Sequence, residues 1–521
     1  MSKRILSIWC LLGLAVFSDQ RSTPADDSYV AAAVEYQVSA DVEQNLQNYV
    51  QLIKEAAEQN ADIIVFPELT LTRGSRSVNV PMYDLLKTQP IPALLPLAYD
   101  ELLVGISTAA RNHQIYVLIN VQEFMDCNTV PEGSEEYCPE KKEYLFNTNV
   151  IFDRNGAVID RYRKINLFGE FSRTPALKPD LGLFTTDFGV TFGHYICFDL
   201  MFQVPAIQVV EKNQITDVLF STMWFSEMPY LSAVQIQEAY AYAENVNFIG
   251  AGANNVRVGS AGSGIYSGKA GALVSTMPGL PTTRLLVSRV PKVPGNVTGM
   301  SYPGPIYDNP ADHDSLVLIT DPSLPDHISR PLVNGFQEFT LVDKDVSCRF
   351  RVRLNQREGV QVEHYHYRAA VFDGERSFSG LGEGDTRICS VIACTGDTMH
   401  TCGKRFPLYK QNATSLFEEL SIVATVPTPV VVPQLNAKDS AFFPVSLDVS
   451  IMPLEVDEYT YTEVQNNENT VFTFTLVNTG KDLYTFAVFG RVYSTGASIV
   501  PVLSKSLFYM IAALTMKLLL L

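Results

Sequence analysis

Cys197 is the residue whose type and position most directly suggest covalent chemistry. It closes an apolar run at residues 190–196, and Phe198 and Asp199 after it open a predicted helix. A thiol at a strand-to-helix turn lies at the edge of a sheet, and a helix start favours its thiolate form. The backbone N–H of Phe198 is well placed to bind an oxyanion, and Asp199 is interpreted as a helix cap. Since a lone cysteine is often just a small buried hydrophobe, placement alone does not decide its role.

Two charged residues upstream could handle protons for this thiol. Glu68 directly follows the buried run at residues 63–67, and a carboxylate at the end of such a strand points into the cleft where α/β sheets bind ligands. Lys164 ends a basic cluster at residues 161–164. Each also has an ordinary interpretation, the glutamate as a loop residue and the lysine as part of a solvated surface.

Other catalytic or cofactor-binding constellations find less support. His194 is three residues before Cys197 on the same predicted strand and faces the opposite side, which disfavours a Cys–His pair. His364 and His366 would share one strand face, but without a third ligand we predict no metal site. No glycine loop of the phosphate-binding kind is present, and no cofactor is predicted.

The residues around these candidates alternate between strand and helix patterns, which predicts an α/β domain over residues 28–305. A helix is expected at residues 41–59, with Asp41 and Gln44 as its capping pair. The expected strands are residues 29–38, 63–66, 114–121, 148–153, 190–196, 217–222 and 247–251.

A second, mainly β domain is predicted over residues 330–493. One strand is expected at residues 367–372, ended by a turn at Asp373-Gly374. Residues 471–477 and 484–492 are expected to pair as a hairpin around the turn at residues 478–480.

Both ends of the chain carry apolar segments that suggest export and anchoring. Residues 1–18 have a basic start and a short apolar run, which is typical of a secretory signal peptide. Residues 494–521 combine small residues, a short spacer and an apolar tail, the pattern of a glycolipid-anchor signal. A C-terminal transmembrane helix is the alternative, although Lys517 close to the end disfavours it.

Cysteine use and sequons agree with an oxidising, extracellular compartment. Of the eight cysteines, Cys10 lies in the predicted signal, which leaves seven in the mature chain. Cys127 and Cys138 flank a polar loop and are expected to bridge, whereas the last four cysteines could pair in three ways. Cys197 has no local partner. Asn296 and Asn412 begin glycosylation sequons.

Composition excludes several classes of partner. With 46% hydrophobic and 18% charged residues the chain has ample material for a core and is not intrinsically disordered. A net charge of -17 disfavours nucleic acid as a partner, because both carry negative charge.

Three motifs occur in one order along the chain: Pro67-Glu68, then residues 162–164, then residues 196–199. Their types and spacing resemble those of the nitrilase superfamily of carbon–nitrogen hydrolases, over roughly residues 29–271. Within it the chain looks most like the vanin and biotinidase branch, which shares the segments at residues 161–168, 197–199, 231–234 and 262–266.

The resemblance implies a four-layer αββα sandwich followed by a mainly β domain, and a triad of Glu68, Lys164 and Cys197. Glu68 would serve as general base and acid, Lys164 as oxyanion stabiliser and Cys197 as nucleophile. A second glutamate past the lysine is also implied, which Glu170 matches only approximately. Trp224 and Phe225 stand where relatives line the substrate pocket, although core packing would explain them equally well.

Two functions follow as hypotheses. The first is an extracellular amidase that acts on a small linear amide, by resemblance pantetheine or a biotinyl amide. The second is a catalytically silent, surface-anchored binding or structural protein that keeps the fold. The presence of all three triad residues favours the amidase, whereas the sequence leaves the substrate and the oligomeric state open.

Overall fold

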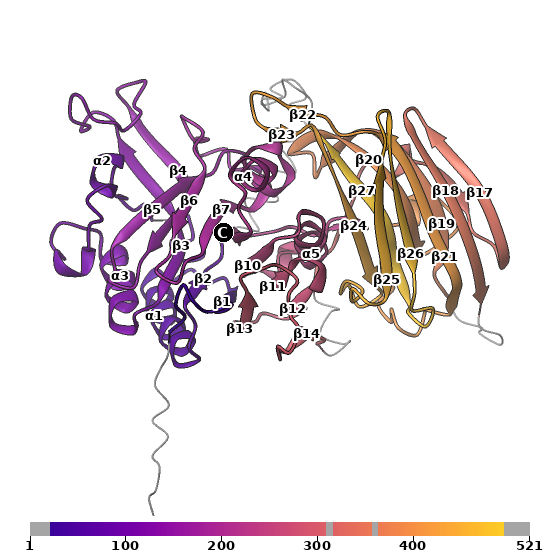
Figure 1. Ribbon diagram of the computed structural model, residues 1–521, viewed down its shortest axis with the longest axis horizontal. Coiled ribbons are helices and arrows are strands. Elements are labelled where there is room, and N and C mark those ends of the chain that lie inside the picture. Colours follow the sequence, from indigo (N-terminus) through magenta and orange to yellow (C-terminus); the bar gives the residue numbers. More distant parts are fainter. Residues whose placement is uncertain (1–20, 75, 309–315, 357–362, 494–521) are drawn as a thin grey trace, which may run out of the picture.

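The protein is described by a computed structural model that covers residues 21–74, 76–308, 316–356 and 363–493. The predicted signal at residues 1–18 and the apolar tail at residues 494–521 lie outside the described residues. From left to right, Figure 1 shows helices, two facing sheets, further helices and a β-sandwich. This order confirms the α/β region and the mainly β region that follows it.

Two sheets form the centre of the first half of the chain, and β1 joins them because it pairs with both β2 and β10. The first sheet contains β1 (Ser28–Gln37), β2 (Ile63–Val65), β3 (Tyr116–Asp126), β4 (Glu143–Phe152), β5 (Val158–Arg163) and β13 (Arg284–Pro291). The second contains β6 (Gly182–Thr185), β7 (Thr191–Ile196), β8 (Asp217–Thr222), β10 (Asn247–Asn254), β11 (Ser263–Ser267), β12 (Ala272–Thr276) and β14 (Gly304–Ile306).

Alternation along β1 explains why helices and a second sheet cover its two faces. Ala32 and Val34 belong to the core under the helices, whereas Ala31 and Ala33 belong to the core between the sheets. The helices of the outer layers are α1 (Val42–Glu58) and α3 (Glu101–His113) on the first sheet, and α4 (Gln208–Asn213) and α5 (Ala233–Glu244) on the second. The four-layer αββα sandwich is therefore confirmed.

Strand direction decides where a site can form in this sandwich. β2 runs parallel to β1, β1 to β10, β10 to β8, and β8 to β7. The carboxyl ends of β2, β7 and β8 therefore point the same way, toward one edge of the two sheets.

The second half of the chain is a sandwich of two five-stranded antiparallel sheets. The first has the order β16 (Ile328–Pro331), β19 (His366–Phe378), β20 (Gly382–Cys394), β27 (Leu483–Val492) and β24 (Ser440–Asp448). The second has the order β17 (Gly335–Asp343), β18 (Val346–Gln356), β21 (Ser415–Pro427), β26 (Asn469–Leu476) and β25 (Tyr459–Gln465). Phe474 and Phe486 stack across the core between them, with ring centroids 3.7 Å apart.

Two turn predictions in this region are wrong. Asp373-Gly374 lies inside β19, where both residues pair with β20, so the strand continues to Phe378. The segment at residues 478–480 does connect two strands, but β26 and β27 belong to opposite sheets rather than to a hairpin. The turn-forming residues at positions 478–480 correctly indicated a connection between two strands, but they do not determine whether those strands pair with each other.

Disulfides account for six of the cysteines. The expected bridge between Cys127 and Cys138 is present, with a Cα–Cα distance of 5.7 Å. The four late cysteines pair as Cys348–Cys389 and Cys394–Cys402. Among the residues that the structure describes, Cys197 is the free cysteine, as the sequence indicated.

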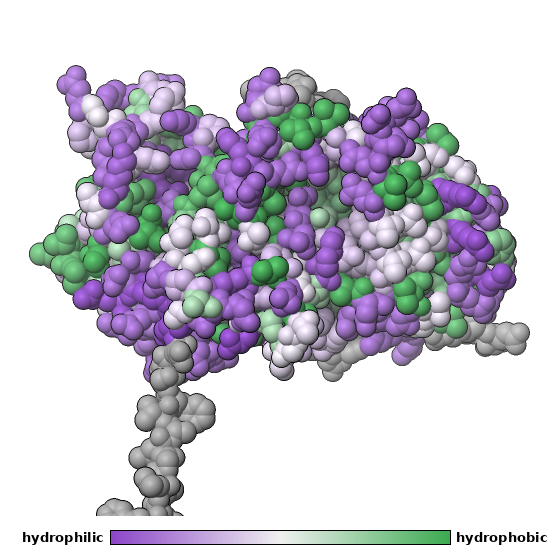
Figure 2. Space-filling model, viewed as in Figure 1, coloured by the Kyte–Doolittle hydropathy of each residue, from purple (hydrophilic) through white to green (hydrophobic). Residues whose placement is uncertain are grey.

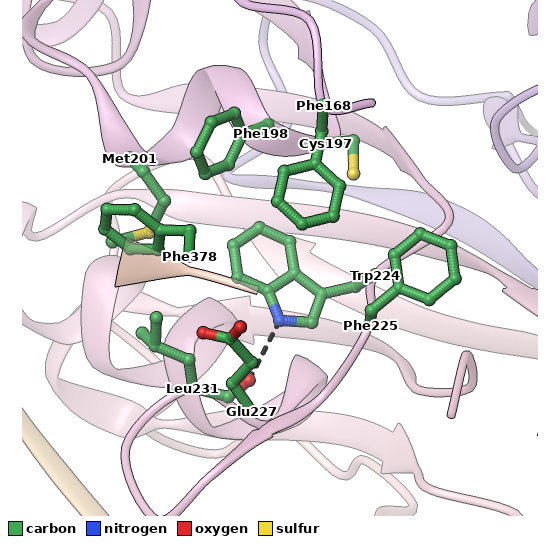
Figure 3. A pocket seen from close by; sticks show the side chains of 9 residues that line it. All are labelled: Phe168, Cys197, Phe198, Met201, Trp224, Phe225, Glu227, Leu231 and Phe378. Atoms are coloured by element: carbon green, nitrogen blue, oxygen red, sulfur yellow. Dashed lines mark hydrogen bonds between the residues drawn. The ribbon is translucent and has the colours of Figure 1, made fainter. Parts of the chain in front are cut away.

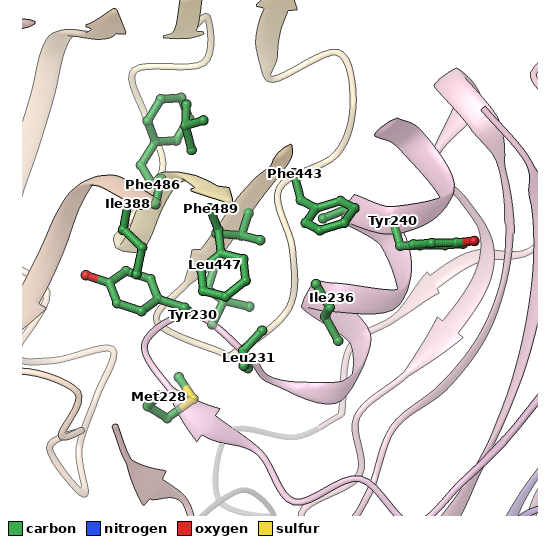
Figure 4. Close-up of a cluster of buried hydrophobic side chains, with 14 of the residues drawn as sticks. Met228, Tyr230, Leu231, Ile236, Tyr240, Ile388, Phe443, Leu447, Phe486 and Phe489 are labelled. Atoms are coloured by element: carbon green, nitrogen blue, oxygen red, sulfur yellow. The ribbon is translucent and has the colours of Figure 1, made fainter. Parts of the chain in front are cut away.

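The two halves share one hydrophobic core, because α5 packs between the second sheet and β24. Figure 4 shows Ile236 of α5 close to Phe443 of the β-sandwich, and the Tyr240 ring of the same helix lies 6.2 Å from the Phe443 ring. Hydrogen bonds cross the same joint: Thr485 Oγ1 donates to the Pro229 carbonyl at 2.9 Å, and the Tyr230 and Ser390 hydroxyls lie 2.9 Å apart.

The surface face in Figure 2 is mostly hydrophilic, with an apolar projection at the left beside α2 (Tyr83–Leu86) and α3. The exposed residues Leu94, Leu95 and Leu97 belong to the segment that joins these two helices. Within the four described ranges, no helix is both long and apolar enough to span a bilayer.

The buried joint between the two halves makes stability depend on pH through Glu238 of α5. Burial, assisted by the nearby Glu455 carboxylate, raises the pKa of Glu238 to about 8. Because the folded pKa exceeds the ordinary value of 4.5, Glu238 lowers the free energy of unfolding once the pH is high enough to ionise it in the unfolded chain. This loss is absent below pH 4.5 and grows as the pH rises toward 8. We expect Glu238→Gln to remove this loss, which reaches at most about 5 kcal/mol. Thermal midpoints between pH 5 and 9 measure it, with Glu58→Gln on the exposed side of α1 as the control. Equal pH slopes for wild type and Glu238→Gln would contradict the prediction.

Candidate active site

Glu68, Lys164 and Cys197 come together at the sheet edge where the strands end. Glu68 follows β2, Lys164 directly follows β5, and Cys197 directly follows β7. All three are buried, with exposed fractions of 4%, 1% and 5%. Three segments far apart in the sequence thus bring a carboxylate, an ammonium and a thiol into one cluster.

Cys197 occupies a strained turn. Its φ of 48° lies in the left-handed region, which is uncommon for a residue with a side chain. The turn leads into the helix expected here, which is a 3₁₀ helix of five residues, Cys197–Met201, and so is too short for a strong dipole. The Phe198 N–H lies in the first turn of this helix, where N–H groups lack an acceptor within the helix.

Glu68 is held as a carboxylate by three donors. Lys164 Nζ and Asn147 Nδ2 donate to its Oε1 at 2.8 Å and 2.7 Å, and the Met223 N–H donates to Oε2 at 2.8 Å. Burial alone would raise the pKa of Glu68, but the Lys164 charge and these hydrogen bonds outweigh it and leave the pKa below its usual value.

Lys164 lies between two carboxylates. Its Nζ is 2.8 Å from Glu68 Oε1 and 2.5 Å from Glu170 Oε1, and Asn147 also donates to Glu170 Oε2 at 2.8 Å. Burial opposes the charge, yet Glu170 and Glu68 hold the pKa of Lys164 well above its usual value. Glu170, matched only approximately in the sequence, thus lies in direct contact with the lysine.

The Cys197 thiol is neutral in this environment. Burial is the first cause that raises its pKa, and the Glu68 charge raises it further, while Lys164 lowers it. The Sγ–H donates to the Met223 carbonyl at 3.7 Å, and the N–H of the same residue binds Glu68. A protonated thiol needs a nearby base before it can act as a nucleophile, and Glu68 is a carboxylate close enough for its charge to act on the thiol.

Asp199 joins the lysine segment to the cysteine turn. It accepts from Ile196 N–H at 3.2 Å, which is the capping contact expected, and from Tyr162 OH at 2.7 Å. It also accepts from the Asn166 N–H at 2.8 Å and the Asn166 side chain at 2.9 Å. Burial raises the pKa of Asp199 to about 6. These bonds fix Lys164 and Cys197 relative to each other.

An aromatic pocket opens next to the thiol (Figure 3). Trp224 and Phe225, which follow β8, lie in its wall, and the Trp224 indole N–H donates to the Leu231 carbonyl at 2.9 Å. The other residues that line the pocket are Phe168, Cys197, Phe198, Met201, Glu227, Leu231 and Phe378. Glu227 and Phe378 were not singled out from the sequence, since a charge after a strand and an aromatic in a β region are common features.

The remaining candidates lie elsewhere. His194 is buried and pairs with Asp160, its Nε2 2.8 Å from Oδ2. His364 and His366 stack with centroids 4.9 Å apart on the β-sandwich. Asn296 is exposed, as a glycosylation site must be, whereas the Asn412 amide donates to the Glu363 carbonyl.

Comparisons with known proteins agree with this geometry. Residues 30–273 match the family model described as "Carbon-nitrogen hydrolase", and residues 317–495 match "Vanin C-terminal domain". "Vanin-like protein 2" of Drosophila melanogaster is 34% identical over 516 residues, which cover 94% of each chain. The chain belongs to the vanin family. This vanin-family protein is also 28% identical to mouse "Pantetheinase", over 78% of each chain. It is 29% identical to human "Biotinidase", over 72% of this chain and 73% of that protein.

The charge balance around the thiol can be tested by alkylation. Lys164→Met removes the cation that lowers the pKa of Cys197, so the thiolate fraction falls. We expect the rate of Cys197 alkylation by iodoacetamide at neutral pH to drop at least about tenfold. Mass spectrometry of the labelled peptide measures it, with melting curves to establish folding. The exposed Lys54→Met is the matched control, and an unchanged rate in Lys164→Met would contradict the account.

Proposed function

We propose that this vanin-family protein hydrolyses a small linear amide through a thioester on Cys197. The observation that carries the proposal is the contact network of Glu68, Lys164 and Glu170 next to a neutral, buried thiol at an aromatic pocket. A nucleophile, a base and an oxyanion stabiliser are the groups that acyl transfer requires.

In the first half-reaction Glu68 accepts the thiol proton while Cys197 Sγ attacks the amide carbonyl. The Phe198 N–H and the Lys164 ammonium stabilise the oxyanion of the tetrahedral intermediate. Glu68 then returns the proton to the leaving nitrogen as the C–N bond breaks, which releases the amine and leaves the acyl group as a thioester.

In the second half-reaction Glu68 accepts a proton from water, and the resulting hydroxide attacks the thioester carbonyl. Collapse of this intermediate breaks the C–S bond, and the proton from Glu68 restores the thiol as the carboxylic acid leaves. Lys164 keeps its proton throughout, because Glu68 and Glu170 flank it and hold its pKa high.

Pantetheine and biotinyl amides are the first substrates to test, because the family includes proteins named pantetheinase and biotinidase. The three disulfides and the exposed Asn296 sequon support an extracellular location for the enzyme. A glycolipid anchor at the predicted tail would hold the enzyme at the outer membrane surface.

An amide panel tests this function. We expect wild-type protein to release amine from at least one pantetheine or biotinyl amide, and Cys197→Ala to lose at least about a thousandfold in kcat/KM. Glu68→Gln should fail at the same step, since Glu68 is the carboxylate that binds both Lys164 and the Met223 N–H beside the thiol, whereas Glu170 contacts Lys164 alone of these two. Equal secretion and melting temperature of the variants are the control. If wild type releases no amine from the whole panel, the silent binding protein replaces the amidase as the interpretation.

A further inference from the structure

The β-sandwich contributes one wall of the pocket. β19 continues through Asp373-Gly374 to Phe378, whose ring lies 5.4 Å from that of Phe198, edge to face. The turn that follows packs on the same region: a Cβ on Gly382 would lie 3.2 Å from the Phe198 ring, and one on Gly169 would lie 3.0 Å from Leu381. The pocket is therefore complete only when both halves of the chain are folded together.

Phe378 is fixed in place by two guanidinium groups. Arg376 lies 4.7 Å and Arg491 5.2 Å from its ring centroid. Arg491 is held by backbone carbonyls, with its Nε donating to Met201 at 3.0 Å. This aromatic wall is thus positioned by charges from the β-sandwich rather than by apolar packing alone.

Glu227 is the charged residue among the nine that line the pocket, all of which lie in described segments. Figure 3 shows its carboxylate below the Trp224 ring, on the side of Phe378 and Leu231. Arg376 Nη2 donates to its Oε2 at 2.7 Å, and the Ser379 hydroxyl donates to Oε1. Asp321 accepts from Arg376 Nε at 2.7 Å, so one guanidinium serves two buried carboxylates.

Two carboxylates share the Arg376 guanidinium, at a place where the side chains of Arg376, Asp321 and Glu227 are at most 4% exposed. Arg491 lies near the same Phe378 ring but donates to backbone carbonyls, so the carboxylate of Glu227 is only partly neutralised and presents negative charge to the pocket. Arg376, the Ser379 hydroxyl and the Ser379 N–H donate to the Glu227 carboxylate, which has about four lone-pair sites and so keeps one for a further hydrogen bond. Negative charge in an apolar pocket attracts a donor and repels an anion.

We propose that Glu227 determines the specificity of the pocket for the acyl group of the amide. It recognises a neutral acyl chain that carries a hydroxyl or N–H donor beyond the carbonyl, and it disfavours an acyl chain that ends in a carboxylate. The acyl group is the part assigned to the pocket, because it must stay on Cys197 while the amine leaves and water enters. This inference rests on the proposed function for the identity of the reacting group.

Binding to the Cys197→Ala protein tests the inference without turnover. The probes are pentanamide, 5-hydroxypentanamide and the monoamide of glutaric acid, which differ at the far end of the acyl chain. We expect ligand-observed NMR titrations to give at least about tenfold tighter binding of the hydroxyl amide than of the carboxylate amide. Introducing Glu227→Gln should remove most of that difference, mainly by improving binding of the carboxylate amide.

Two further variants separate specificity from folding. Ser379→Ala keeps the Glu227 charge and should keep the rejection of the carboxylate amide. Glu338→Gln alters a Glu–Arg pair on the outer sheet of the sandwich and should change nothing. Unchanged discrimination in Glu227→Gln, or no binding of any probe, overturns the inference. Discrimination in binding without turnover by wild type would instead overturn the proposed function and leave this inference standing.

Discussion

The ammonium of Lys164 is the charge around which the site is organised. Removing an ion of this kind from water costs several kcal/mol, so a lysine that is 1% exposed must be surrounded by compensating groups. Glu68 and Glu170 supply that compensation, and Asn147 bonds to both carboxylates. The segments after β2 and β5 are consequently held together by their ion pairs and hydrogen bonds. Asp199 connects them to the cysteine turn, because it accepts from both Tyr162 and the Ile196 N–H.

The second constraint is the burial of α5 on both sides. In a free αββα sandwich the outer helices have one face in water, yet α5 buries Gln235, Gln237 and Glu238 together with its apolar residues. The β-sandwich covers this outer face, and the same contact carries β19 to the pocket. The packing of the two halves and the shape of the pocket therefore depend on the same interface.

The sequence predicted what local patterns encode. The buried strands, helix α1 with its Asp41 cap, the first disulfide and the free Cys197 all follow from residue types at short spacing. Strand pairing in the β-sandwich does not follow from such local patterns. Asp373-Gly374 would form a turn only if no neighbouring strand paired with it, and β20 pairs with both residues. Glu227 and Arg376 are 149 residues apart, and no local pattern indicates that two such residues meet.

The protonated state of Cys197 also bears on how long the thiol survives in the oxidising compartment that the disulfides indicate. Oxidants and disulfides react with thiolates, and a buried thiol whose pKa is raised presents very little thiolate to them. Among the residues that the structure describes, the other six cysteines are paired in disulfides and so offer no thiol for exchange with Cys197. The thiol can thus stay reduced without a reducing system, and in the proposed mechanism it becomes reactive only when Glu68 takes its proton.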